Sequence, residues 1–280
     1  MLQKRNSQVK RIIYTTIVML SLFFIAKPLL REVSADTTAP QKTGKIYIFV
    51  NFQEEESYYE DGPSRGRVKA RLEQISGERC LVIPYQELNM TLVEELNPLA
   101  IVMSGFSRRG NIEKYAGVCE VLNKCEIPMM CFCGSHQLIG WCITKDSEKP
   151  SIRPVGAMRK ILPDEDFPRV AKSKTSDISQ YFLASGFFPI KRVQDDPIFA
   201  GFPEQMIMKC SHYCELKILP PDFELLASSG HCKIAMIKHK SRVLYGTQFH
   251  PEAYSEPWMD GKKLLENFAN IVKKYWEEKK

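Results

Sequence analysis

Apolar runs alternate with stretches of helical spacing from residue 45 onward. Runs without polar alternation, typical of strands buried on both faces of a parallel sheet, occupy 45–51, 80–84, 99–103 and 128–132. Apolar residues recur at helical spacing in 64–75, 111–123 and 261–275. Strands that alternate with helices of this length predict βαβ units in a doubly wound, mostly parallel α/β sheet.

The second half of the chain has shorter apolar segments. They predict short strands at 188–193, 206–210, 225–229, 234–238 and 242–249. The stretch 142–185 is rich in Lys, Ser, Asp and Pro, and we interpret it as an elaborated loop or lid with short strands around 156–161.

Residues 1–35 have a different pattern. Basic residues precede a 15-residue apolar run from Ile12 to Ala26, and Val33-Ser34-Ala35 is typical of a signal-peptidase site. The run is shorter than the roughly 20 residues that a membrane-spanning helix needs. We therefore expect a signal peptide or an uncleaved signal anchor at 1–35, a linker at 36–44 and one domain at 45–280. This leader predicts an exported protein, periplasmic or extracellular, with a membrane anchor if the signal is retained.

Net charge and cysteine content limit the kinds of partner and ligand that we expect. The leader carries most of the formal net charge of +6, and the rest of the chain has no basic stripe interleaved with aromatic residues, so we expect no nucleic-acid partner. The nine cysteines do not form a compact Cys/His set with zinc-finger spacing, so we expect no metal and no cofactor. One or two disulfides are expected if the compartment is oxidising.

Cys133 occupies a position that is typical of a reactive cysteine. Cys133 ends an apolar run and precedes small residues and a helical stretch, which predicts a sharp strand-to-helix turn that presents the thiol. His250 and Glu252 follow another predicted strand. A thiol needs a base, and the base needs a group that orients it, so these residues predict a Cys-His-Glu hydrolytic site.

Several segments resemble the class I glutamine amidotransferase family, which includes relatives among the γ-glutamyl hydrolases. The resemblance rests first on Cys133-Gly-Ser-His-Gln137 paired with Gly246-Thr-Gln-Phe-His-Pro-Glu252. Segments 196–203, 211–212 and 219–227 follow in the family's order. The resemblance implies a flavodoxin-like fold over roughly residues 45–275.

The resemblance also implies roles for individual residues. Cys133 would form a γ-glutamyl thioester, with His250 as base and later acid, and Glu252 would orient His250. The backbone N–H groups of Gly105 and Gly134 would form the oxyanion hole. The residues that match the family's substrate contacts are Gln137, Ser211 and His212.

Two departures affect the predicted turn and one affects the oxyanion loop. The family turn has glycine two residues before and two residues after the nucleophile, where this chain has Cys131 and Ser135. The family's Gly-Gly oxyanion loop is replaced here by Gly105-Phe106.

The predicted activity is hydrolysis of a γ-glutamyl amide or peptide bond, with glutamine or a γ-glutamyl peptide as substrate. Export would separate the chain from ATP-dependent synthetases, which favours a stand-alone hydrolase. Two alternatives stay open. One is the glutaminase subunit of an amidotransferase with a separate synthetase partner. The other is a catalytically silent binding module of the same fold.

Overall fold

The computed structural model describes residues 45–52, 62–105, 115–142, 158–160 and 182–279. The predicted leader and linker, Phe106 and most of the predicted loop over 142–185 lie outside these residues, so the predicted domain boundaries stay predictions. Within the described residues, no helix combines the length and the apolar character needed to cross a membrane.

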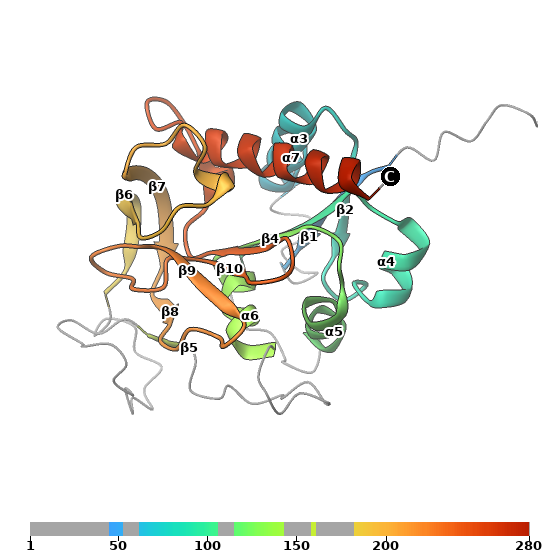
Figure 1. Ribbon diagram of the computed structural model, residues 1–280, viewed down its shortest axis with the longest axis horizontal. Helices are drawn as coiled ribbons and strands as arrows, with labels where there is room; N and C mark the ends of the chain where they lie inside the picture. Colours follow the sequence, from blue (N-terminus) through green and yellow to red (C-terminus); the bar gives the residue numbers. More distant parts are fainter. Residues whose placement is uncertain (1–44, 53–61, 106–114, 143–157, 161–181, 280) are drawn as a thin grey trace, which may run out of the picture. The chain divides into compact units, whose positions relative to one another are not determined.

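A nine-stranded sheet forms the centre of the domain, in the order β2-β1-β3-β4-β11-β10-β9-β6-β7 (Figure 1). Its parallel part comprises β1 (Tyr47–Asn51), β2 (Cys80–Pro84), β3 (Ala100–Met103), β4 (Met129–Phe132) and β11 (Leu244–Thr247). Its antiparallel part adds β10 (Met236–His239), β9 (Phe223–Ser228), β6 (Ala184–Arg192) and β7 (Gln205–His212). A separate pair joins β5 (Met158–Lys160) to β8 (Cys214–Leu216).

Helices cover both faces of the parallel strands (Figure 1). On one face lie α3 (Gly62–Ser76) and α7 (Asp260–Glu278), which contact each other. On the other lie α5 (Ala116–Lys124) and α6 (Gly134–Cys142), with α4 (Met90–Leu96) beside α5. Two 3₁₀ turns, η2 (Pro197–Phe199) and η3 (Pro251–Ala253), complete the described elements. The predicted doubly wound α/β fold is confirmed.

The central strand β1 shows why the apolar runs lack polar alternation. Tyr47 and Phe49 pack into the core under α3 and α7, whereas Ile48 and Val50 pack into the core on the opposite face. Successive side chains of a strand point to opposite faces, so a strand buried on both sides is apolar throughout.

Helix α4 was not predicted, although its ends carry recognisable signals. The Asn89 side chain accepts a hydrogen bond from the Leu92 backbone N–H, and Asn97 has a left-handed conformation with φ 40°. Asparagine is common at both positions, as an N-cap and as a helix-ending residue. Strand β8 was also missed, because its three residues are too few for a periodic pattern.

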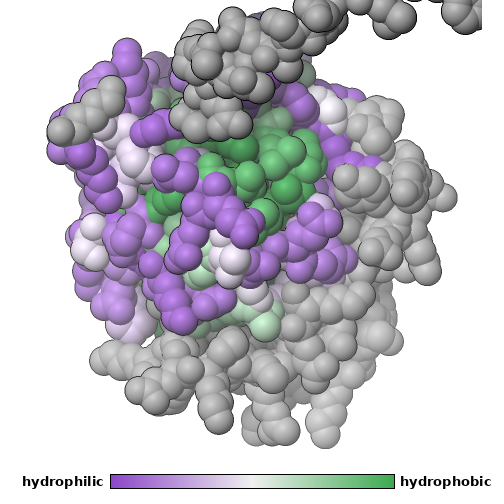
Figure 2. All heavy atoms as spheres, turned by 90° about the vertical axis from the view of Figure 1, so that its right-hand side faces the viewer, coloured by the Kyte–Doolittle hydropathy of each residue, from purple (hydrophilic) through white to green (hydrophobic). Residues whose placement is uncertain are grey.

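The β2 edge of the sheet is partly apolar at the surface. Figure 2 views this side, where hydrophobic residues gather in the centre within a rim of hydrophilic ones. On β2 itself, Leu81 is 41% exposed. Apolar atoms make up much of the surface of any folded protein, so we assign no role to this edge.

A disulfide joins Cys119 of α5 to Cys142 of α6. The closed loop contains β4 and the turn at Cys133. The other seven cysteines are buried and lie outside this disulfide.

Candidate active site

Cys133 lies on a strained turn between β4 and α6. Its φ of 48° falls in the left-handed region, which only one other described non-glycine residue, Asn97, adopts. This conformation is costly for side chains other than glycine, and such strain is typical of a nucleophile presented at a strand-to-helix turn. The Cys133 backbone N–H donates to the Thr247 carbonyl at 2.6 Å, which fixes the turn against the end of β11.

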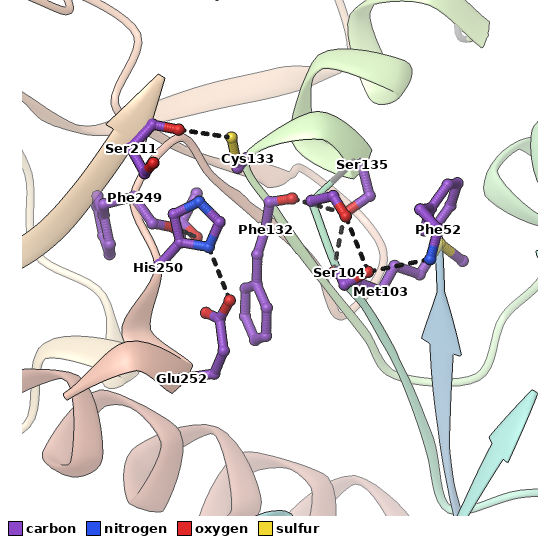
Figure 3. Close-up of polar contacts among 12 residues, drawn as sticks. Phe52, Met103, Ser104, Phe132, Cys133, Ser135, Ser211, Phe249, His250 and Glu252 are labelled. Atoms are coloured by element: carbon purple, nitrogen blue, oxygen red, sulfur yellow. Dashed lines mark hydrogen bonds and ion pairs between the residues drawn. The ribbon is translucent and has the colours of Figure 1, made fainter. Parts of the chain in front are cut away.

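The two residues that replace family glycines fit this turn. Neither Cys131 nor Ser135 has a positive φ, so neither position requires glycine. The Ser135 hydroxyl lies 2.9 Å from the Met103 carbonyl and 3.0 Å from the Phe132 carbonyl, so it has acceptors in its buried position (Figure 3). Cys131 is fully buried, and burial raises the pKa of its thiol to about 12. A thiol with this pKa is unsuited to nucleophilic attack at neutral pH.

His250 and Glu252 form a close pair beside Cys133 (Figure 3). The His250 Nδ1 lies 2.7 Å from a Glu252 carboxylate oxygen. Burial alone would lower the pKa of His250. The charges of Glu252 and Cys133, together with their hydrogen bonds to the ring, outweigh burial and raise the pKa well above its usual value. A cationic imidazole between a carboxylate and a thiol stabilises the thiolate, which is the nucleophilic form of cysteine.

A contact from α3 holds the segment that carries this pair. The guanidinium of Arg71 donates to the backbone carbonyl of Glu252 and stacks 3.9 Å from the centre of the Tyr254 ring. The backbone N–H of His250 donates to the Lys209 carbonyl at 2.7 Å. The segment with His250 and Glu252 is therefore anchored both to α3 and to β7.

Gly105 and Gly134 lie beside the thiol, as predicted for an oxyanion hole. A Cβ at Gly105 would come within 3.1 Å of Cys133 Cβ, 3.1 Å of His250 Cε1 and 3.5 Å of the Gly134 backbone nitrogen. Glycine at 105 therefore leaves space next to Cys133 and His250. The role of the two N–H groups stays a prediction.

The predicted substrate contacts divide into two groups. Ser211 faces the site, and its carbonyl lies 3.9 Å from the Cys133 thiol. Gln137 and His212 are buried and do not line the cavity beside Cys133. The Gln137 amide donates to the Cys214 carbonyl at 2.8 Å, and His212 Nδ1 lies 3.0 Å from the same oxygen.

A cavity of about 360 Å³ opens beside the three predicted catalytic residues. It is lined by Phe49, Asn51, Arg65, Arg67, Val68, Arg71, Ser104, Gly105, Cys133, Lys209, Ser211, His250, Glu252 and Ala253. Four of these side chains are arginine or lysine, and Glu252 is the only acidic one among them. This lining suits a substrate that carries a carboxylate.

Sequence reasoning missed several residues of this site. Arg67 and Arg71 of α3 are four residues apart, a spacing that places two basic side chains on one face of a helix. The Gln248 side-chain amide lies 3.5 Å from the Cys133 thiol. Gln248 belongs to the quoted segment before His250, but nothing in the spacing pointed to its side chain.

Two archaeal relatives match most of the chain. A subunit of glutamine-hydrolyzing GMP synthase from Archaeoglobus fulgidus is 32% identical over 234 residues, which are 82% of this chain and 100% of that protein. The corresponding GMP synthase subunit from Pyrococcus abyssi is 31% identical over 64% of this chain and 78% of that protein.

These relatives correct the predicted localisation. The prediction of an exported protein, periplasmic or extracellular and so separated from synthetases, is wrong, because the relatives are themselves named as subunits of a synthase. They also favour the alternative of a glutaminase subunit over the stand-alone γ-glutamyl hydrolase.

A solved structure and a family model complete the comparison. A crystal structure of a GMP synthase subunit from Thermoplasma acidophilum has a TM-score of 0.60 and 21% identity, and the match covers 84% of this chain and 98% of that one. That likeness shows the fold. The model of the family described as glutamine amidotransferase class-I matches residues 68–272. This chain therefore belongs to the class I glutamine amidotransferase family.

Proposed function

We propose that this protein is the glutamine-hydrolysing subunit of an amidotransferase and supplies ammonia to a separate synthetase subunit. The observation that carries the proposal is the pairing of His250 with Glu252 at 2.7 Å beside a thiol on a strained turn. Its relatives, which are named as GMP synthase subunits, support the choice of partner.

The residues support a two-step hydrolysis of glutamine through a thioester. The Cys133 thiolate attacks the side-chain amide carbon of glutamine, and the C–N bond breaks as His250 protonates the leaving ammonia. A γ-glutamyl thioester remains on Cys133. Water, deprotonated by His250, then attacks the thioester, which releases glutamate and restores the thiolate and the cationic imidazole.

The oxyanion that forms in each step needs stabilising donors. We assign this role to the backbone N–H groups of Gly105 and Gly134, because both glycines lie beside the thiol. Removing one such donor in other acyl-transfer enzymes costs about 10²–10³ in rate.

The basic lining of the cavity supports an anionic substrate. Arg67, Arg71 and Lys209 line the space beside Cys133. Glutamine carries an α-carboxylate that such residues attract, and a γ-glutamyl peptide carries one as well. The lining therefore does not distinguish glutamine from a γ-glutamyl peptide as the substrate. A turnover assay with both compounds is needed for that.

A turnover assay with matched variants tests the proposal. The protein is incubated with glutamine and with γ-glutamyl peptides, and the same assays are run on Cys133→Ser and on Cys131→Ser. We expect glutaminase activity that is lost in Cys133→Ser and kept in Cys131→Ser, because the same change is made two residues away in a buried strand thiol.

The other hypotheses have distinct outcomes. Cleavage of γ-glutamyl peptides without glutaminase activity would select the stand-alone hydrolase. No turnover, together with no labelling of Cys133 by a glutamine-analogue electrophile, would select the silent binding module. The partner is tested by adding the synthetase subunit of GMP synthase and measuring glutamine-dependent formation of GMP.

A further inference from the structure

Three side chains outside the proposed catalytic triad gather their donor atoms at one point. Among the described residues, one ligand atom each from Cys210, His212 and His231 lies within 4.8 Å of the others. Cys210 and His212 are two residues apart on β7, so their side chains share one face of the strand. His231 comes from the turn between β9 and β10.

Hydrogen bonds leave one nitrogen of each histidine facing this point. His212 Nδ1 lies 3.0 Å from the Cys214 carbonyl, so it donates and Nε2 carries the lone pair. His231 Nδ1 lies 3.4 Å from the Ser229 hydroxyl. The Nε2 atoms of both rings are buried and have no hydrogen-bond partner among the described residues.

Unpartnered buried nitrogens are costly unless something binds them. A buried polar atom without a partner costs about 1–3 kcal/mol in proteins. His212 is only 4% exposed, so solvent does not offset that cost. Neutral imidazole with a free ring nitrogen is the metal-binding form of histidine.

We propose that Cys210, His212 and His231 form a binding site for a divalent transition-metal ion, with Zn²⁺ as the best match. One thiolate and two imidazoles are zinc ligands, whereas Mg²⁺ and Ca²⁺ prefer oxygen. The Cys214 carbonyl and the Ser229 hydroxyl then act as the outer partners that fix the ring orientations.

The distances allow such a site after a small contraction. Zinc–sulfur bonds of about 2.3 Å and zinc–nitrogen bonds of about 2.0–2.1 Å place tetrahedral ligands about 3.3–3.6 Å apart, so donor atoms within 4.8 Å must close by at most about 1.5 Å. Rotation of the half-buried His231 can supply this movement. Phe188 packs edge-on against that ring, with 4.8 Å between centroids, which gives the site an apolar wall.

Binding would break the S–H bond of Cys210 as the metal–sulfur bond forms, and the proton would pass to the buffer. The thiol proton is therefore released when the ion binds. The ion would hold β7 to the turn that carries His231. The Ser211 carbonyl that contacts the Cys133 thiol lies between two of the ligands, so the ion would brace one wall of the proposed active site.

Cobalt and zinc titrations of the full chain test the site. The reduced protein is stripped with a chelator and titrated with Co²⁺, then with Zn²⁺. We expect one ion per chain and a thiolate-to-cobalt charge-transfer band that Zn²⁺ removes. Cys210→Ser should abolish the band. His231→Ala should weaken binding at least about 100-fold, because losing an outer partner alone costs about 10- to 100-fold.

Matched variants keep the test decisive. All nine cysteines and all five histidines lie within the described residues, so other ligand sets can be checked one by one. Cys125→Ser and His239→Ala, which change residues outside the cluster, should bind like the wild type. Cys133→Ser should also keep the band. A band lost in Cys133→Ser and kept in Cys210→Ser would overturn the proposal, as would the absence of any cobalt band in folded wild-type protein.

Discussion

Glu252 controls the charge of His250. Its carboxylate is a main reason why the pKa of the ring is raised despite burial. Glu252→Gln keeps a hydrogen-bond acceptor and removes the charge, so we expect the pKa of His250 to fall, as measured by NMR titration of the ring. Glutaminase activity should fall by about 10²–10⁴-fold, the usual contribution of acid–base catalysis.

The matched control for this change is Glu266→Gln on α7, where the side chain is 46% exposed and pairs with Lys262 of the same helix. Wild-type kcat/KM in Glu252→Gln would show that the carboxylate does not serve the reaction.

The raised pKa of His250 also makes stability depend on pH. A group whose pKa is higher in the folded state stabilises the protein fully below its unfolded pKa of about 6.5 and loses that contribution as the pH rises through the folded value. The free energy of unfolding of wild type minus that of His250→Gln should therefore be largest at low pH and shrink as the pH rises. Urea unfolding of both proteins at a series of pH values measures this difference.

His239 serves as a control because its pKa is shifted in the opposite direction. Burial, aided by Arg242, lowers its pKa, so His239→Gln should improve relative stability as the pH falls below about 6.5. Parallel pH profiles for the two variants would contradict the assignment of opposite shifts.

Gly105 tests whether the space beside the thiol is needed. An added methyl group would contact Cys133 and His250 at 3.1 Å, so Gly105→Ala must displace a reacting group by a few tenths of an ångström. We expect kcat/KM to fall by about 10²-fold, because small misplacements have effects of this size. Gly66→Ala on α3 meets nothing within 4 Å and should leave activity unchanged while adding about 0.5–1 kcal/mol of stability.

At the scale of single residues, the candidate site was predictable where neighbouring residues share a task. His250 and Glu252 are two residues apart, and the structure brings both to Cys133. Gln248 and Arg71 were not predictable, because their contacts depend on which strand and helix pack there. The sequence marks the two glycine replacements as departures from the family turn, yet only Cys133 has the left-handed conformation there.

At the scale of elements, Arg71 links α3 to the turn η3. Arg71→Met keeps much of the side-chain volume but loses the hydrogen bond to the Glu252 carbonyl and the stacking on Tyr254. We expect the free energy of unfolding to fall by about 1.5–3 kcal/mol, the range for a hydrogen bond with a charged partner. Denaturant unfolding measures this change.

Arg67→Met removes the same charge from the same helix. Among the described residues, Arg67 makes no hydrogen bond or ion pair, so stability should stay within about 0.5 kcal/mol. If both variants lost the same free energy of unfolding, the loss would come from removing a charge and not from breaking the link to η3.

Long elements were predicted better than short ones. The strands of the parallel part are unbroken apolar runs, and the 19 residues of α7 are enough for a clear apolar period. Strand β8 has three residues, and α4 is marked mainly by its end residues. The pairing order of the strands is set by tertiary contacts that no local pattern contains.

At the scale of the whole molecule, the disulfide between Cys119 and Cys142 closes a loop that contains Cys133. Cys119 and Cys142 are 23 residues apart, and a loop of this size stabilises a fold by about 3 kcal/mol in the chain-entropy account. Cys142→Ser should lower the free energy of unfolding by about that amount, measured by urea unfolding without reductant. Cys125→Ser, which changes a buried free thiol, should cost less.

Thiol titration provides a direct check. The unreduced protein, once denatured, should expose seven of its nine cysteines as free thiols. Nine reactive thiols would contradict the disulfide.

The fold class followed from the alternation of strands and helices, whereas the cellular setting did not. The leader pattern suggested export, and the relatives that are subunits of a synthase overturned that prediction. A short N-terminal segment carries little information about the partners of the domain that follows it.

The hydrogen bond from the Cys133 N–H to the Thr247 carbonyl limits which insertions and deletions the sequence can accept. Phe132 pairs with Thr247 across β4 and β11, and adjacent strands lie about 4.8 Å apart. The thiol and the imidazole meet because these two strands align in one register. A single inserted residue in β11 would keep all three side chains in the sequence and still separate them, since a one-residue slip turns every following side chain to the other face. We therefore expect insertions and deletions within 244–250 to be tolerated far less than the positions of Cys133, His250 and Glu252 alone suggest.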